Sequence, residues 1–76
     1  MKSTPNKKFL KALGKRVKEL REKQEISQSQ LAFESDIPRE QLSRIEIGKH
    51  ATSVSNILSI ANALSIHLKE LYDFDY

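Results

Sequence analysis

The sequence has 76 residues, no cysteine, and 13 Lys and Arg residues against 10 Asp and Glu residues, which leaves a net charge of +3. A chain of this length forms one domain with a modest core. Without cysteine it can hold neither a disulfide framework nor a cysteine-based zinc site. No apolar run approaches the ~20 residues of a membrane span, and no apolar stretch follows the charged N-terminus as in a secretory signal. We therefore expect a cytoplasmic protein with no membrane segment.

The charges are divided unevenly along the chain. Residues 1–23 carry nine basic and two acidic side chains, whereas residues 24–76 carry four basic and eight acidic ones. A basic front of this kind favours a polyanionic partner, and the plain alternative is a solvated helix face. Charge alone leaves both interpretations open.

The first predicted helix begins near Thr4, an N-cap residue followed by Pro5 at the first helical position. Apolar residues then recur every three or four positions, as one helical stripe requires: Phe9 or Leu10, Leu13, Val17 and Leu20. This helix is expected to run to about Gln24. Residues 1–5 are expected to be flexible, within a single domain that spans residues 1–76.

Two short helices are predicted next. Ser27 and Gln30 have the spacing of a capping box at the start of the second helix. Residues 36–38, Asp-Ile-Pro, interrupt the pattern, because proline is excluded from a helix interior but can begin a helix. The third helix is expected over about residues 38–47, with Gly48 ending it.

The last third of the chain predicts two further helices. Ser53 is the expected cap of the fourth helix, and the apolar face of this helix is formed by Val54, Ile57, Leu58, Ala61 and Leu64. A short connection leads to a final helix that contains Leu68, Leu71 and Tyr72. Residues 72–76 form an acidic and aromatic tail. No strand-like alternation of useful length is present, so the predicted fold class is all-α with five helices.

The third predicted helix separates an apolar face from a polar one. Leu42 and Ile45 point to the core, with Glu46 at the edge, and the opposite side carries Arg39, Glu40, Ser43 and Arg44. A short helix with such a face can enter a major groove about 12 Å wide. There arginine can donate two hydrogen bonds to guanine, and glutamate can accept one from cytosine. Gln28 and the backbone N–H groups at the start of the second helix can hold a phosphate.

Three segments in this order and spacing carry a family resemblance: GKRVKELREKQEISQSQLA, IPREQLSRIEIGK and ILSIANALSIHLKEL. Through them, residues 14–71 resemble the helix-turn-helix family of phage lambda Cro and repressor proteins, also called the Xre family. The resemblance implies a compact five-helix domain of the lambda repressor-like type, with the helix-turn-helix at helices 2 and 3. It also implies a transcriptional regulator that binds double-stranded DNA sequence-specifically.

The resemblance also assigns roles by position. It places Gln28 against DNA, and Lys49, just past the third helix, against the DNA backbone. It joins Arg21 and Glu46 in an ion pair between the first and third helices, and leaves open whether Arg21 also faces a phosphate. The residues implied to face bases or nearby phosphates are Arg39, Glu40, Ser43 and Arg44, with Gln41 on the flank within reach of a phosphate.

Some of these side chains have a plainer interpretation. Glu40 would repel phosphates, so it reads a cytosine, orients an arginine, rejects other bases, or simply pairs with Arg44 four residues on. Ser43 has the alternative role of permitting close approach by being small. The lysines of the first helix surround it, so most are expected to be solvated. Arg16 and Lys15 are the candidates there for a phosphate contact.

Several positions depart from the family pattern. Glu25, Asp36 and Ser65 stand where the family often has glycine, and Thr52 stands where it has proline. Glycine suits left-handed turns, and a replacement there typically costs about 1 kcal/mol. We expect the architecture to be kept despite these changes. Ile47 replaces a usually polar residue, and three roles are open to it: packing on the loop, contact with a thymine methyl, or contact with a partner.

The sequence contains no constellation for catalysis or metal binding. His50 and His67 are seventeen residues apart, with no acidic cluster at ligand spacing. No Ser-His-Asp set can be argued from spacing, and there is no glycine-rich phosphate loop. We therefore expect neither an enzyme, nor a metal or other cofactor, nor a small-molecule ligand.

The resemblance further implies a homodimer through the C-terminal helices. Two third helices would then meet the half-sites of a palindromic operator about one turn, ~34 Å, apart. The expected dimer surface is the region around Ile60, residues 64–68 and the aromatic tail. Tyr72, Phe74 and Tyr76 either close the core or contribute to that contact.

The leading expectation is a minimal repressor or activator of phage, plasmid or restriction-modification type, because 76 residues leave no room for a separate effector domain. The rival hypothesis is a protein-interaction module, such as an antitoxin or a partner of another regulator. The acidic C-terminal half would suit that role. If the rival is right, the C-terminal surface should matter and the two arginines of the third helix should not.

Overall fold

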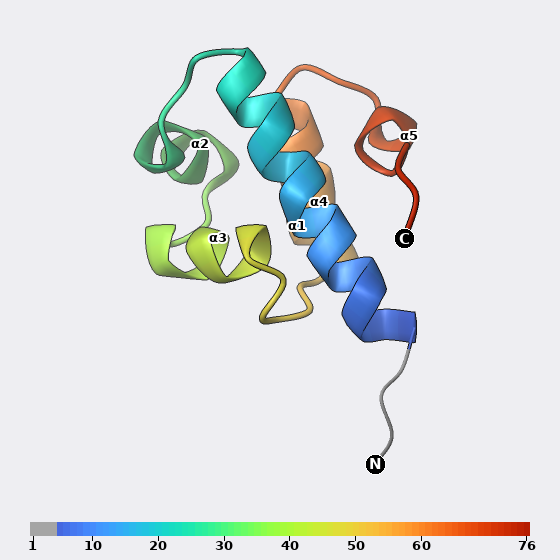
Figure 1. Cartoon of the computed structure of the whole chain (residues 1–76). Coiled ribbons are helices and arrows are strands. Elements are labelled where there is room, and N and C mark those ends of the chain that lie inside the picture. The colour runs from blue at the N-terminus through green and yellow to red at the C-terminus, as the bar shows by residue number, and fades with distance from the viewer. Residues whose placement is uncertain (1–4) are drawn as a thin grey trace.

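The computed structural model describes residues 5–76, and within them the chain forms five helices and no strand (Figure 1). The helices are α1 (Pro5–Lys23), α2 (Gln28–Ser35), α3 (Arg39–Glu46), α4 (Val54–Ala63) and α5 (Leu68–Leu71). The all-α, five-helix prediction is confirmed, and the helix ends lie close to the expected ones. The expected cap at Thr4 and, apart from Pro5, the expected flexible start fall outside the described residues.

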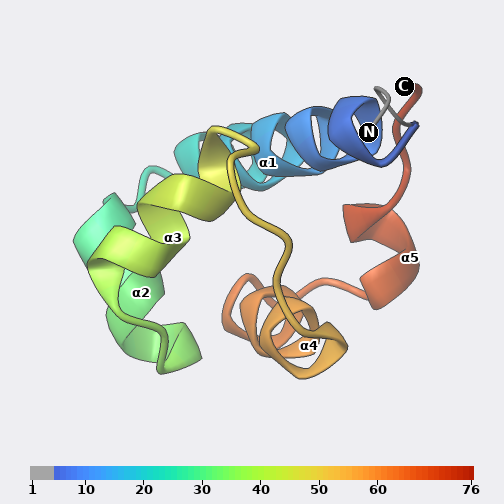
Figure 2. The ribbon, with the colours of Figure 1, turned by 90° about the horizontal axis from the view of Figure 1, so that it is seen from below.

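The long helix α1 crosses one side of the molecule, and the shorter helices pack against it and each other (Figures 1 and 2). α1 contacts α3 and α5, α2 packs against α3 and α4, and α4 contacts α5. Figure 2 shows α2 and α3 at one end of the molecule and α5 at the other. The core draws on every helix, and its largest fully buried side chains are Val17, Leu31, Leu42, Ile60, Leu64 and Leu71.

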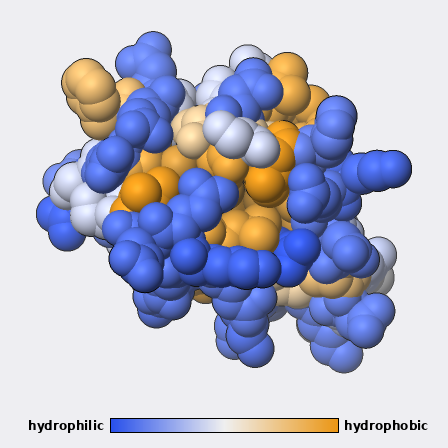
Figure 3. All heavy atoms as spheres, turned by 90° about the horizontal axis from the view of Figure 1, so that it is seen from above, coloured by the Kyte–Doolittle hydropathy of each residue, from blue (hydrophilic) through white to orange (hydrophobic). Residues whose placement is uncertain are grey.

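The edge of this core reaches the surface. Partly buried apolar side chains that pack on it include Leu20, Ile26 and Ile66. Viewed from above, hydrophobic atoms occupy the middle of the face and hydrophilic side chains surround them (Figure 3). Across residues 5–76, no helix has the length and apolar character to cross a membrane.

The buried face of α4 differs from the predicted one. Ile57, Ile60, Ala61 and Leu64 are buried, whereas Val54 and Leu58 are 73% and 47% exposed. Two apolar stripes overlap on this helix, and the neighbouring helices cover only the one at positions 57, 60, 61 and 64. The assignment of Ile60 and Leu64 to a dimer surface is therefore wrong, because both side chains lie in the core.

Two of the predicted helix caps are present. Ser27 Oγ accepts a hydrogen bond from Gln30 N at 3.0 Å, and Ser53 Oγ accepts one from Asn56 N at 3.0 Å. Each hydroxyl thus satisfies a backbone donor in the first turn of a helix. The full capping box predicted at Ser27 is wrong, because the Gln30 side chain donates to Glu34 Oε2 at 3.0 Å instead of returning to the cap.

Three turns adopt the left-handed conformation without glycine. The φ angle is 60° at Glu25, 57° at Asp36 and 58° at Ser65, the positions where the resemblance places glycine. Each of these residues follows a helix, and its conformation lets the next backbone N–H groups donate to the last carbonyls of that helix. Ile26 N, for example, donates to Arg21 O at 3.3 Å. A Cβ makes this conformation unfavourable by roughly 1–2 kcal/mol per residue, so these turns hold strain that glycine would remove.

We expect Glu25→Gly to raise the free energy of unfolding by about 0.5–1 kcal/mol. Glycine removes the Cβ strain at a φ of 60°, and this gain exceeds the extra conformational entropy that glycine gives the unfolded chain. Urea denaturation followed by circular dichroism measures the change. The matched control is Glu25→Ala, which removes the same charge but keeps a Cβ. An equal gain in the control would assign the effect to charge and not to the turn.

The helices α1 and α3 approach each other closely at Gly14. A Cβ at this position would meet the carbonyl oxygen of Ile45 and lie 2.6 Å from that of Glu46. Both are backbone atoms, which cannot rotate away as the end of a flexible side chain can, so a larger residue would displace α3. The missing side chain at Gly14 therefore fixes how closely the end of α3 sits on α1.

The C-terminal tail folds back on α1. The centroid of the Phe9 ring lies 6.0 Å from that of Tyr72, 5.4 Å from that of Phe74 and 5.1 Å from that of Tyr76. Aromatic rings attract one another at such separations in stacked or edge-to-face arrangements. Phe74 is partly buried and packs against the core, whereas Tyr72 and Tyr76 are 37% and 68% exposed. The structure therefore supports the core-closing role for Phe74, and a contact with a second copy stays a prediction for the two tyrosines.

Candidate nucleic-acid interface

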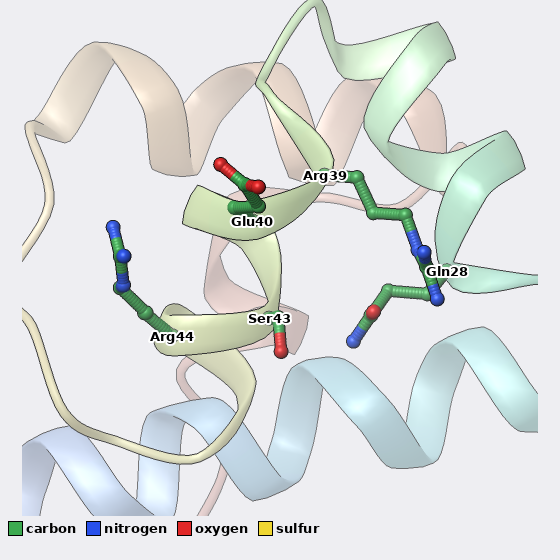
Figure 4. A pocket seen from close by; sticks show the side chains of 5 residues that line it. All are labelled: Gln28, Arg39, Glu40, Ser43 and Arg44. Carbon is green, nitrogen blue, oxygen red and sulfur yellow. The ribbon is translucent and has the colours of Figure 1, made fainter.

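The outward face of α3 forms a shallow hollow together with the start of α2. Its lining consists of Arg39, Glu40, Ser43 and Arg44 from α3 and Gln28 from α2 (Figure 4). The opposite face of α3 is held in the core by Leu42 and Ile45. The structure therefore brings together most of the side chains that the sequence resemblance directs toward DNA.

The charged groups of this hollow take part in no ion pair. Within residues 5–76, the pair of Arg21 with Glu46 is the only one within 4.0 Å. Glu40 and Arg44 therefore form no ion pair in the structure, so the alternative role proposed for Glu40 is not supported. In Figure 4, Arg39 extends toward Gln28 and Arg44 extends the opposite way. The two guanidinium groups are thus separated along α3 and can bind different groups of one ligand.

The ion pair between Arg21 and Glu46 ties α1 to α3. Arg21 Nε donates to Glu46 Oε2 at 2.8 Å, and Nη2 donates to Oε1 at 3.0 Å, which makes the pair bidentate. Arg21 Nη1 donates to Ile26 O at 3.0 Å and so supports the turn after α1. The hydrogen-bonded Glu46 carboxylate raises the pKa of Arg21, against the opposing effect of burial. Arg21 is only 9% exposed, so its position favours the structural role over a phosphate contact.

Gln28 connects this ion pair to the hollow. Gln28 Nε2 donates to Glu46 Oε1 at 3.0 Å, the same oxygen that accepts from Arg21 Nη2. The carboxylate therefore orients the Gln28 carboxamide at the first position of α2. Sequence reasoning missed this contact, because Gln28 and Glu46 are 18 residues apart and no periodic pattern links them.

Arg16 does not lie on this face. Arg16 Nε and Nη2 donate to Glu70 O at 3.1 Å and 2.9 Å, which ties α1 to α5. α5 lies at the end of the molecule away from α2 and α3 (Figure 2). The arrangement corrects the choice of Arg16 as a candidate phosphate contact, because two of its donors already hold the backbone of α5.

The loop after α3 adds polar side chains beside the hollow. Lys49 N donates to Arg44 O at 2.9 Å, which keeps this loop close to the end of α3. Gln41 and Arg44 line a second, smaller hollow with His50 and Ala51. Sequence reasoning considered His50 only as a metal ligand and missed this position, because no pattern predicts the path of a loop. In the part of the chain that the structure describes, no three His, Asp or Glu side chains gather as at a metal site.

A short helix with a buried aliphatic face, exposed arginines and a preceding helix that braces it defines a helix-turn-helix protein of the DNA-binding class. The chain belongs to the helix-turn-helix family, whose model matches residues 17–71. It is a DNA-binding transcription regulator of the Cro/C1 type. The family resemblance of the sequence is thus confirmed.

Known proteins are similar to this chain over most of its length. Control protein C.BamHI of Bacillus amyloliquefaciens is 42% identical over 62 residues, which cover 80% of this chain and 76% of that protein. The crystal structure of the restriction-modification controller protein C.AhdI from Aeromonas hydrophila has a TM-score of 0.79 and 39% identity, over 84% of this chain and 96% of that one. The competence regulator ComR from Streptococcus vestibularis has a TM-score of 0.80 and 30% identity, over 90% of this chain but 23% of its own.

Proposed function

We propose that α3 enters the major groove of a specific duplex and reads base edges there. The observation that carries this proposal is the outward face of α3, where Arg39, Glu40 and Arg44 share one hollow and no ion pair engages their charges in residues 5–76. Arginine can donate bidentate hydrogen bonds to guanine, and glutamate can accept one from cytosine N4. Ser43 lies between these residues and is short enough to let the helix approach the bases.

Residues on both sides of α3 would fix its register on the DNA backbone. Gln28, oriented by Glu46, opens α2, and the N–H groups of a first helical turn favour an anion such as phosphate. Gln41 and Lys49 lie on the other side, with the loop after α3. Phosphate contacts position a protein but carry no base information, so sequence preference would come from α3.

We propose that the chain acts as a homodimer on a palindromic operator, with half-sites about one turn, ~34 Å, apart. The exposed apolar residues Val54 and Leu58 of α4 support a contact surface for a second copy in the C-terminal half. C.BamHI is named a control protein and C.AhdI a restriction-modification controller protein. We extend this role to the chain, as a regulator of restriction-modification genes.

The experiment that tests the proposed function is selection of bound duplexes from a random DNA pool at two salt concentrations. Enrichment of a palindrome would support specific reading by a dimer and would give the half-site spacing. Binding that is weak, unenriched and steeply salt-dependent would contradict the proposal, because it requires only basic surface. The rival role, a protein-interaction module, would then be preferred.

Arg39→Ala and Arg44→Ala are each expected to weaken binding to the selected duplex by about 1–3 kcal/mol and to relax base preference locally. Each arginine on the outward face of α3 can make a bidentate contact with one guanine, and alanine leaves that base without a partner. Fluorescence anisotropy with the selected duplex and its single-base variants measures both effects. If the two variants keep the wild-type base preference, α3 is not the element that reads the sequence.

Lys49→Ala provides a contrasting result in the same assay. Loss of one phosphate contact should weaken binding to all duplexes about equally and reduce the salt slope by roughly one. Unlike the two arginines, Lys49 belongs to the loop after α3 and not to its outward face. A change in base preference on Lys49→Ala would instead assign this side chain to a base contact.

A further inference from the structure

A groove runs between the first turns of α1 and the loop after α3. Its volume is about 710 Å³, and its lining includes Lys7, Leu10, Lys11, Ile47, Lys49 and His50. We call it the α1–loop groove. The sequence predicts that most of the α1 lysines are solvated, because a helical pattern does not show which of them another segment approaches.

Glycine brings the two sides of the α1–loop groove together. Gly48 has a φ of 76°, and a Cβ there would lie 2.6 Å from Lys11 Cα. Any other residue would therefore force the loop away from α1. The close contact places Lys49 and His50 beside Lys11, although they are distant along the chain.

The chemistry of the α1–loop groove combines an apolar floor with basic side chains. Leu10 is half-buried and Ile47 is 56% exposed. Lys7, Lys11 and Lys49 are exposed, and none of the described residues that line the groove is acidic. A nucleic-acid strand has the complementary alternation, because apolar faces of deoxyribose are joined by anionic phosphates.

The α1–loop groove is continuous with the outward face of α3, the hollow lined by Gln28, Arg39, Glu40, Ser43 and Arg44, which we call the reading face. His50 lines both this groove and the small hollow that contains Gln41 and Arg44. Figure 4 shows Arg44 extending away from Gln28, which lies on the opposite side of the reading face. A helix in the major groove has one DNA backbone on each side. Gln28 would therefore meet one backbone, and the α1–loop groove lies where the other would pass.

We propose that the α1–loop groove binds the sugar–phosphate backbone of one strand of the operator. Lys7 and Lys11 contact phosphates there, and Ile47 packs against deoxyribose. This contact with the sugar differs from the three roles that the sequence left open for Ile47: packing on the loop, contact with a thymine methyl and contact with a partner. This inference rests on the proposed docking of α3 in the major groove.

The test is the double variant Lys7→Ala/Lys11→Ala, compared with Lys8→Ala/Lys23→Ala. Both pairs remove two positive charges from exposed residues of α1, but Lys8 and Lys23 do not line the α1–loop groove. The affinities of both variants are measured across a salt series, for the selected duplex and a scrambled one. Because two phosphate contacts are lost, Lys7→Ala/Lys11→Ala should reduce the salt slope by about 1.8, equally for both duplexes. Lys8→Ala/Lys23→Ala should change the salt slope little.

Phosphate ethylation interference locates the contact. Ethylation at the phosphates that Lys7 and Lys11 contact should weaken binding of the wild-type protein but not of the double variant Lys7→Ala/Lys11→Ala. Ethylation at the phosphates that Gln28 contacts should weaken binding of both proteins. Equal salt slopes for the two double variants, or an unchanged ethylation pattern, would overturn the inference. Failure of the proposed function is distinguishable, because it would appear as unchanged base preference in Arg39→Ala and Arg44→Ala.

Discussion

Glu46→Ala should lower the free energy of unfolding by about 3–5 kcal/mol, because it leaves a buried guanidinium without its counter-ion. The Arg21 and Glu46 side chains are only 10% and 3% exposed, so water cannot replace the lost carboxylate. A 76-residue chain has a total stability of roughly 4–11 kcal/mol at typical values per residue. The variant should therefore lose a large part of its stability, which a urea titration followed by circular dichroism measures.

The control for Glu46→Ala replaces both partners. Arg21→Met/Glu46→Met substitutes an apolar pair for the ion pair, and such exchanges are often neutral or stabilising. The double variant should therefore be more stable than Glu46→Ala. Because Gln28 Nε2 donates to the same carboxylate, both variants should also lose the orientation of Gln28. A loss below about 1 kcal/mol in Glu46→Ala would mean that the ion pair is weak, as exposed ones are.

Leu42→Ala is the second change with a large expected effect, a loss of about 2–5 kcal/mol in the free energy of unfolding. Leu42 is fully buried on the inner face of α3, so alanine leaves a cavity that the surrounding helices fill only in part. Thermal and urea denaturation in the absence of DNA measure the loss. DNA binding should fall in proportion to the unfolded fraction, without a change in base preference.

The matched control for Leu42→Ala is Phe33→Ala. Phe33 is larger than leucine but is 86% exposed, so its removal should change the free energy of unfolding by no more than about 0.5 kcal/mol. If Phe33→Ala were as destabilising as Leu42→Ala, burial would not explain the effect. The pair separates the contribution of the core from that of apolar surface.

The helices and most of their ends could be predicted because their signals are local. Hydroxyl caps such as Ser27 and Ser53 and stops such as Gly48 act within a few residues, and an apolar stripe shows within two turns. The predicted inner face of α4 was wrong at Val54 and Leu58, because burial depends on the neighbouring helices. Val54 and Leu58 are as apolar as the core residues of α4, but the neighbouring helices do not cover them.

The candidate interface was predictable where one helix carries it. Leu42 and Ile45 fix the inner face of α3, so the outward position of Arg39 and Arg44 follows from helix geometry. Contacts between distant segments could not be predicted in this way. The Arg16 bonds to α5 and the approach of Lys11 to the loop depend on how α1 packs in three dimensions.

Gly14 has a consequence for the kinetics of DNA recognition. Since α1 and α3 meet backbone to backbone there, and an ion pair ties the same two helices, α3 is preorganised before it meets a ligand. A rigid reading element loses little conformational entropy on association. Encounters should therefore be governed by electrostatic steering and not by a slow rearrangement, and differences among operators should appear mainly in the dissociation rate.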